Sequence, residues 1–385
     1  VRRHLEPYRD SDVARLYWEC GMGDIAYYLS KFARVPTYDN LTAFGPMDTH
    51  NYRLGAESWR SLRDKNIDPF GVACDHAHEL GIEFHASYRV AGFHFPPMHD
   101  HFDYGPSFYK LHPELRGMAR DGGRTPRLSY AYPEVRRLAV SLLTEVAETF
   151  PVDGVCLLYN RRPPLVEYDL PVVEGFRAEY GEDPRELDEH DPRWLGYRAG
   201  TLTQFMREVR HAMDRVAERQ GRDRRIEVSA IVASDEQENL YFAMDLGAWV
   251  EEGLVDTLIP YSSESDMGGN GRSWTDVRDL AYFMGITQGT SCRLAPNIMP
   301  RQTTSDDYRR RALSLYEAGI EDLFFWDCDI LQARLEDLAR WHTLCRLGHR
   351  EELESWRSSG EPAVSADTMH FRKLGDWDLS YVTPG

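Results

Sequence analysis

The sequence predicts an α/β protein of the (β/α)8 class, a TIM barrel. Short apolar segments alternate with longer segments of helical periodicity, and this alternation indicates parallel strands joined by helices. The apolar segments are nearly continuous, as expected for strands that are buried on both faces. No GxGxxG motif follows a strand, which argues against a dinucleotide-binding fold. The length of 385 residues suits one large barrel domain.

Seven segments are expected to be barrel strands, because β-branched and aromatic residues are concentrated in them. They are Val13–Cys20, Ile82–Val90, Val152–Tyr159, Ile226–Ala233, Val255–Tyr261, Cys292–Met299 and Asp322–Asp327. A barrel of this class has eight strands, so one is missing. The opening segment, Val1–Asp12, is expected to be the helix that precedes the first of these strands. We therefore expect the missing strand to lie upstream of Val1, and the alternative is that the C-terminal tail closes the barrel.

The segments between the strands are expected to be helices, because apolar residues recur in them with a helical period. They are Pro69–Leu80, Pro133–Phe150, Tyr197–Gln220, Leu240–Glu252, Trp274–Met284 and Asp306–Ala318. Most of them are followed by glycine, which commonly ends a helix. These glycines are Gly81, Gly221, Gly253, Gly285 and Gly319. The repeated strand–helix–strand order predicts right-handed crossovers.

The predicted domain organisation is a barrel domain over residues 1–347 and a C-terminal extension over residues 348–385. In the extension, His370–Val382 is expected to begin a further β element. Two long insertions, Gly21–Asn66 and Ala91–Tyr132, each follow a strand. We therefore expect both at the C-terminal face of the barrel, where long loops usually shape a binding site.

The charge and cysteine content narrow the possible partners. The chain carries 63 Asp+Glu against 45 Lys+Arg, a formal net charge of −18, which argues against nucleic acid or an anionic membrane as a partner. No apolar run is long enough to predict a membrane span. The six cysteines form no CxxC pair and are expected to be buried thiols, which slightly favours the cytoplasm. Because the sequence begins at Val1, secretion stays open, and nothing indicates an oligomeric state.

Polar and aromatic residues are concentrated at the carboxyl ends of the predicted strands, where barrel enzymes place their active sites. This mixture is typical of a carbohydrate site, because carboxylates serve acid–base chemistry, aromatic rings stack on sugars, and Arg and Asn bond hydroxyl groups. The predicted substrate-binding residues are Glu19, His85, Arg89, Asn160, Arg161, Arg162, Tyr261 and Trp326.

Three carboxylates are the candidates for catalysis: Asp235, Glu264 and Asp327. Glycosidic cleavage needs one protonated carboxyl group as the acid and one charged group as nucleophile or base. We assign Glu264 as the acid, Asp235 as the nucleophile or base, and Asp327 as a substitute for either. Each has a structural alternative: Asp235 caps a helix, Glu264 is a solvated loop acid, and Asp327 bonds a neighbouring strand. Glu167 and Asp169 are reserve candidates for the second carboxylate.

The segment LLYNRRPPLVEYD is the most distinctive part of the predicted site. Arg161 and Arg162 are adjacent, and such a pair predicts recognition of an anionic group, such as a uronate or a sulfate ester. The alternative is that one or both pair with Glu167, Asp169 or Glu174.

The other predicted binding residues also have two interpretations. His85 and Arg89 share one strand face with Ser87, so His85 is expected either to bond a sugar hydroxyl or to be a satisfied core residue. Tyr261 and Trp326 either stack on a sugar or pack in the core.

The loop FHFPPMHDHFDYG is a weak candidate for a metal site. His99, His101 and Asp103 are the residues that would ligate the ion, but their spacing matches no standard site. We favour an aromatic loop that covers the barrel mouth and expect neither a metal nor a cofactor. GxSxG, HExxH and Walker motifs are absent from the sequence.

Three segments resemble one known family. They are PEVR with the following helix and PVDGVCLLYN, then IDPFGVACDHAHELGIEFHASYRV, and then LGAWVEEGLVDTLIPYSS. These segments are similar to those of the glycosyl hydrolase-like 10 family, and the similarity covers most of Val13–Trp326. The resemblance implies a (β/α)8 barrel that acts on a glycan. Many relatives carry an Asp pair directly after the "VDGI" strand, whereas this chain has Leu158-Tyr159-Asn160-Arg161 there.

The function predicted from these features is hydrolysis of a polysaccharide or oligosaccharide, with an anionic glycan as one option. The missing acid after the Val152 strand motivates an alternative, a barrel that binds carbohydrate without cleaving it. A metal-dependent hydrolase is a third and weaker hypothesis.

Overall fold

The computed structural model describes residues 1–33, 57–58, 60–90, 108–159, 164–261, 277–298, 304–326 and 338–359. Its main sheet has parallel strands in the order β1, β3, β6, β7, β8 and β9, and the short β2 pairs antiparallel with β1. The bounds are β1 Arg15–Met22, β2 Ile25–Ala26, β3 Glu83–Arg89, β6 Gly154–Leu158, β7 Glu227–Ala233, β8 Thr257–Tyr261 and β9 Arg293–Leu294. A parallel bridge between Asn297 and Phe324 adds the last predicted strand position. All the predicted strand positions are thereby confirmed, in chain order, as those of a (β/α)8 barrel of which one strand is missing from the described residues.

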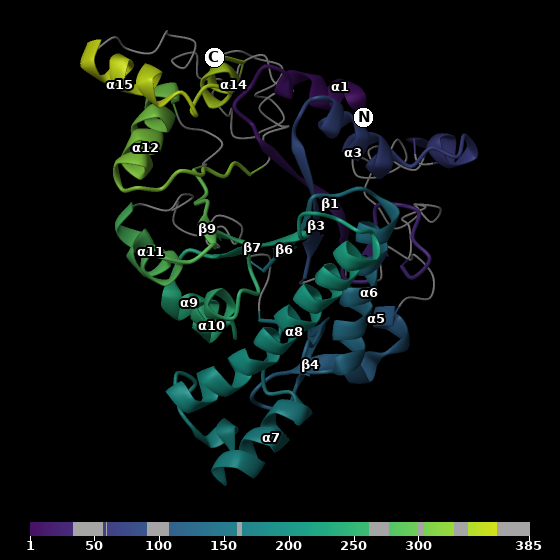
Figure 1. Ribbon diagram of the computed structural model, residues 1–385. Helices are drawn as coiled ribbons and strands as arrows, with labels where there is room; N and C mark the ends of the chain where they lie inside the picture. The colour runs from purple at the N-terminus through teal and green to yellow at the C-terminus, as the bar shows by residue number, and fades with distance from the viewer. Residues whose placement is uncertain are drawn as a thin grey trace, which may run out of the picture.

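Helices cover the outside of the sheet (Figure 1). The larger ones are α3 Pro69–Glu79, α6 Pro133–Thr149, α7 Leu170–Tyr180, α8 Pro192–Arg219 and α12 Ser305–Glu317. The shorter ones are α1 Arg2–Leu5, α5 Phe108–Leu111, α9 Glu236–Tyr241, α10 Leu246–Glu251, α11 Ala281–Thr287, α14 Leu338–Leu344 and α15 Arg350–Ser359. Within the second insertion, β4 Arg116–Met118 and β5 Arg124–Leu128 form a separate hairpin, and 3-10 turns occupy Glu6–Tyr8, Pro113–Leu115, Pro184–Glu186 and Val277–Leu280.

Four helix predictions are wrong in detail. Helix α8 begins at Pro192 and not at Tyr197, and within Val1–Asp12 only Arg2–Leu5 is α-helix, followed by the 3-10 turn Glu6–Tyr8. The segment Leu240–Glu252 is not one helix, because Ala243 has a positive φ of 66° and the Asp245 carboxylate accepts a hydrogen bond from the Ala248 N–H to begin α10. The helix predicted to end before Gly285 continues through it, and the left-handed residue is Gly289, with a φ of +76°. The other predicted helix-ending glycines all adopt positive φ.

The N-terminal segment of the chain contacts α14 and the residue that follows it, which brings the two ends of the barrel together. The Tyr8 ring lies 5.2 Å from that of Trp341, and the Asp12 N–H donates to the Cys345 carbonyl at 2.8 Å. On the inside, the Tyr17 ring lies 5.5 Å from Phe324. Residues 15–19 of β1 are all partly exposed, whereas the central strands are almost entirely buried. This exposure marks the β1 edge as the border of the missing strand's position.

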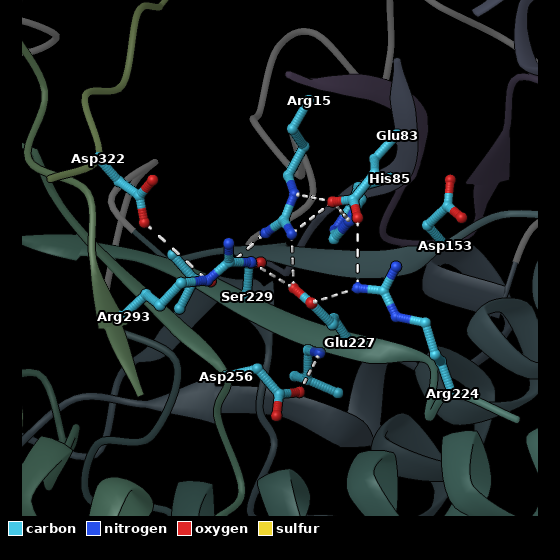
Figure 2. Close-up of polar contacts among 12 residues, drawn as sticks. Arg15, Glu83, His85, Asp153, Arg224, Glu227, Ser229, Asp256, Arg293 and Asp322 are labelled. Carbon is cyan, nitrogen blue, oxygen red and sulfur yellow. Dashed lines mark hydrogen bonds and ion pairs between the residues drawn. The ribbon is translucent and has the colours of Figure 1, made fainter. Parts of the chain in front are cut away.

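The N-terminal end of the barrel is filled by an ion-pair network that Figure 2 shows. Arg15 lies between two carboxylates, at 2.6 Å from Glu83 and 2.7 Å from Glu227. Arg293 pairs with Glu227 at 2.8 Å, and Arg224 approaches Glu83 at 3.4 Å. Four of these residues begin β1, β3, β7 and β9, so the network joins strands at the end opposite the predicted site.

The boundary between barrel and C-terminal extension stays a prediction. Within the described residues, α15 packs against α12 through an ion pair between Arg357 and Glu317. Arg309 of α12 also lies over the Trp356 ring, 5.5 Å from its centroid. The expected β element at His370–Val382 lies outside the described residues.

Candidate functional site

Glu19 and Arg89 form an ion pair near the carboxyl ends of β1 and β3. Their closest approach is 2.7 Å, from Arg89 Nε to Glu19 Oε1. In the β1–β3 register Glu19 pairs with Ser87 and Met22 pairs with Arg89, so the two charged residues lie two positions apart along the paired strands. Two predicted binding residues are thus brought together. The Arg89 side chain is mostly buried, while the Glu19 side chain is 33% exposed.

Tyr261 and Trp326 are also brought together at this end of the barrel. Their ring centroids are 5.3 Å apart, and the two residues are 5% and 8% exposed. Trp326 also packs against Phe324, with ring centroids 6.4 Å apart. Stacking of either ring on a sugar stays a prediction, because both residues are almost fully buried.

His85 lies deep in the barrel rather than at a strand end. It is the third residue of β3, is fully buried, and packs against the Tyr17 ring at 5.3 Å. Its ring occupies the space above Gly154, where any side chain would overlap it. Burial, together with the nearby Arg15, holds the pKa of His85 well below its ordinary value, so the ring is neutral. This placement favours a core position for His85. The residue is not a satisfied core histidine, however, because neither ring nitrogen has a hydrogen-bond partner among the described residues.

Asp235 follows β7 and caps the next helix. Its carboxylate accepts a hydrogen bond from the Glu238 N–H at 2.8 Å, which is the capping alternative. The cap occupies one oxygen, and a catalytic role for Asp235 stays a prediction. The remaining predicted residues lie outside the described residues: Asn160, Arg161, Arg162, Glu264 and Asp327, together with the loop residues His99, His101 and Asp103.

The loop after β6 carries a pair of carboxylates, Glu167 and Asp169, where it packs against the β4–β5 hairpin. Asp169 is fully buried and accepts hydrogen bonds from Met118 N, Ser129 Oγ and Glu167 N at 2.9, 2.5 and 3.0 Å. Glu167 is only partly buried. Gly117 makes room for both acids, because a Cβ there would lie 3.6 Å from an oxygen of each and 2.5 Å from Thr125 Oγ1. Since each distance is 3.6 Å, Asp169 Oδ1 and Glu167 Oε2 are no farther apart than the sum of the two.

The environment of this pair favours protonation. Burial raises the pKa of Glu167, and the nearby Asp169 carboxylate raises it further, because a second negative charge is unfavourable there. Burial also raises the pKa of Asp169, although its three hydrogen bonds act in the opposite direction. A partly exposed acid with a raised pKa at the C-terminal side of a barrel can hold a proton for transfer.

Asp24 is a candidate functional residue that was not predicted from the sequence. It lies in the turn between β1 and β2, is 3% exposed, and accepts a hydrogen bond from Tyr109 N at 3.1 Å through Oδ2. Its other oxygen is buried and has no partner within the described residues. The signal in the sequence is an acid in the segment GMGD, directly after a strand.

The described residues contain neither a membrane-spanning helix nor a cluster of metal ligands. Within that part of the chain, no helix combines the length and apolar character needed to cross a bilayer. Across the same residues, no group of three or more His, Cys, Asp or Glu side chains is arranged to hold a metal ion.

The comparisons with known proteins agree with this architecture. The glycoside hydrolase domain of PgaB (BpsB) from Bordetella bronchiseptica superposes with a TM-score of 0.56 at 13% identity, covering 89% of this chain and 92% of that one. The alpha-L-fucosidase isoenzyme 2 from Paenibacillus thiaminolyticus gives a TM-score of 0.52 at 12% identity, with 94% of this chain covering 46% of the fucosidase. At these identities the likeness shows the fold.

Sequence comparison supplies the family. No curated protein matches the chain. The family model for glycosyl hydrolase-like 10 matches residues 39–272, well over half of the 385 residues. The protein therefore belongs to the glycosyl hydrolase-like 10 family and is a carbohydrate-active barrel.

Proposed function

We propose that the protein hydrolyses a glycosidic bond of a polysaccharide or oligosaccharide, with Glu167 as the proton donor. The observation that carries this proposal is the partly exposed Glu167 carboxyl group, whose pKa is raised by burial and by Asp169. It lies in the loop that follows β6, on the side of the barrel where catalytic groups of this fold are found. It also supplies the acid that is missing directly after that strand.

In this mechanism Glu167 gives its proton to the leaving glycosidic oxygen as the bond from that oxygen to the anomeric carbon breaks. A second carboxylate either attacks the anomeric carbon or takes a proton from the attacking water. Asp235, at the end of the adjacent β7, is our first choice for this role, with Glu264 and Asp327 as the other candidates. Asp169 holds the loop in place through its three hydrogen bonds and does not touch the substrate.

Substrate binding is proposed for the groups around the mouth. The Glu19 carboxylate, held by Arg89, is placed to accept hydrogen bonds from sugar hydroxyl groups. Asn160, Arg161, Arg162, Tyr261 and Trp326 complete the proposed set, and the two adjacent Arg residues would favour an anionic glycan.

The test is turnover of a panel of neutral, anionic and amino-sugar polysaccharides by the wild type and by Glu167→Gln. Loss of a general acid costs about 10²- to 10⁴-fold in rate, so we expect Glu167→Gln to be nearly inactive while it still binds. Asp235→Asn, Glu264→Gln and Asp327→Asn then identify the second carboxylate. Full activity of Glu167→Gln on the hydrolysed glycan would remove its role.

The second candidate function is carbohydrate binding without cleavage. It is favoured by the sequence Leu158-Tyr159-Asn160-Arg161, which carries no acid where many relatives have two. Calorimetric binding of a glycan that is recovered uncut after long incubation would support it.

A further inference from the structure

Arg198 is a buried guanidinium behind the Glu167 loop. It lies on α8 and is 4% exposed. Its terminal nitrogens donate to the Tyr241 carbonyl at 2.9 Å and to the Val166 carbonyl at 3.4 Å. It therefore joins the loop that follows β6 to the end of α9, which follows β7. The Val166 carbonyl belongs to the residue directly before Glu167, so this contact bears on the position of that acid.

The charge of Arg198 is not neutralised at short range. Among the described residues, its hydrogen bonds go to two backbone carbonyls and to no carboxylate, and its Nε has no hydrogen-bond partner there. Its immediate neighbours are aromatic: the guanidinium carbon lies 5.4 Å from the Trp194 ring centroid and 5.7 Å from that of Tyr241. A charge in such surroundings is weakly screened and acts over a longer distance than one at the surface.

The acids that this charge reaches are Glu167 and Asp169, since both interact electrostatically with Arg198. The other groups that face Glu167 are Asp169 on its own loop, and Arg127 and Thr125 from β5. Tyr168 and Tyr241 are the remaining titratable groups around Arg198. Burial lowers the pKa of Arg198, which shows the cost of keeping the cation there.

We propose that Arg198 is a positioning residue for the acid: it fixes the loop at Val166 and stabilises the Glu167 carboxylate that remains after the proton is transferred. The proposal rests on the proposed function for its catalytic meaning. Its physical content, a charge coupling between Arg198 and Glu167, is measurable without any substrate.

The first test is a double-mutant cycle of stability with Arg198→Met and Glu167→Gln, followed by chemical denaturation between about pH 4 and about pH 8.5. Above the pKa of Glu167, we expect the combined effect of the two substitutions on the unfolding constant to differ from the product of their single effects by about tenfold. One nearby charge shifts a pKa by about one unit, and one unit corresponds to a factor of about ten. The coupling should disappear at low pH, where Glu167 is protonated. Arg207→Met on the same helix is the matched control, because Arg207 pairs with Glu252 at the surface and should not couple to Glu167.

The second test uses the pH profile of turnover on whichever glycan is cleaved. Loss of the positive charge raises the pKa of Glu167, so the high-pH limb of Arg198→Met should move up by about one unit while kcat falls. Arg198→Lys keeps the charge and should keep the limb near its wild-type position. Arg198→Gln replaces Arg198→Met if that variant does not fold.

A stability coupling that is absent, or that is the same at all pH values, overturns the proposal. The coupling of Arg198 to Glu167 and the catalytic role of Glu167 can be refuted independently of each other. Normal turnover by Glu167→Gln removes the acid assignment, whereas the stability cycle still decides whether Arg198 is coupled to that carboxylate.

Discussion

Replacing Arg15 by Met should weaken the fold without changing the proposed chemistry. The Arg15 guanidinium is 11% exposed and lies within 2.7 Å of both Glu83 and Glu227. Breaking a fully buried ion pair costs about 3–5 kcal/mol, and an exposed one about 0–1 kcal/mol. Glu227 and Glu83 are 18% and 30% exposed and keep weaker contacts to Arg293 and Arg224, so we expect a loss of about 2–3 kcal/mol.

The measurement is the free energy of unfolding from urea denaturation followed by circular dichroism. Arg207→Met, which removes an exposed pair with Glu252, is the control and should change stability by less than about 0.5 kcal/mol. Turnover per folded molecule should be unchanged in Arg15→Met, because the network lies at the opposite end of the barrel from the proposed site. A loss below about 0.5 kcal/mol would refute the reasoning, since the two carboxylates would then not depend on Arg15.

Two further predictions concern single contacts. His78 bonds Asp153 at 2.8 Å, which raises the pKa of His78, so its contribution to stability is complete below its ordinary value of about 6.5 and is lost as the pH rises through the raised pKa. Denaturation at about pH 5.5 and about pH 8.5 should show this loss in the wild type and not in His78→Gln, and an identical slope in both would exclude it. Gly117→Ala should lower the free energy of unfolding by about 1–3 kcal/mol, because the new methyl group would lie 2.5 Å from Thr125 Oγ1. Gly196→Ala is the control and should cost nothing, because this glycine of α8 faces open space. Equal losses at the two glycines in urea denaturation would contradict the prediction.

Most of the fold could be predicted because each strand carries its own signal. A strand buried on both faces must be apolar almost throughout, and β6 and β8 are fully buried segments of that kind. Helix ends were predictable where glycine adopts positive φ, as at Gly81 and Gly319. The break at Ala243 was not, because alanine carries no turn signal and its backbone is held by the surrounding contacts.

The site was less predictable because its contacts join segments that are distant in sequence. Glu19 and Arg89 were expected at strand ends, but their ion pair depends on the β1–β3 register. Glu167 was recognised as a reserve acid, yet its raised pKa comes from the loop packing against the β4–β5 hairpin. Arg198 gave no signal, since an Arg inside an amphipathic helix is usually solvated.

The Glu167–Arg198 region differs from the N-terminal network in how its charges are held, and this difference supports the location of the proposed acid. In the N-terminal network, Glu83 and Glu227 each lie within ion-pair distance of an Arg, so the charges there stabilise the structure. At the C-terminal side, Glu167 and Arg198 are both held without such a partner among the described residues. An acid and a base that are kept unneutralised raise the free energy of the folded protein, and a fold retains such an arrangement where chemistry needs it. Substituting the network should therefore change stability without changing turnover. Substituting Glu167 should remove turnover, and it should change stability only through its interaction with Arg198.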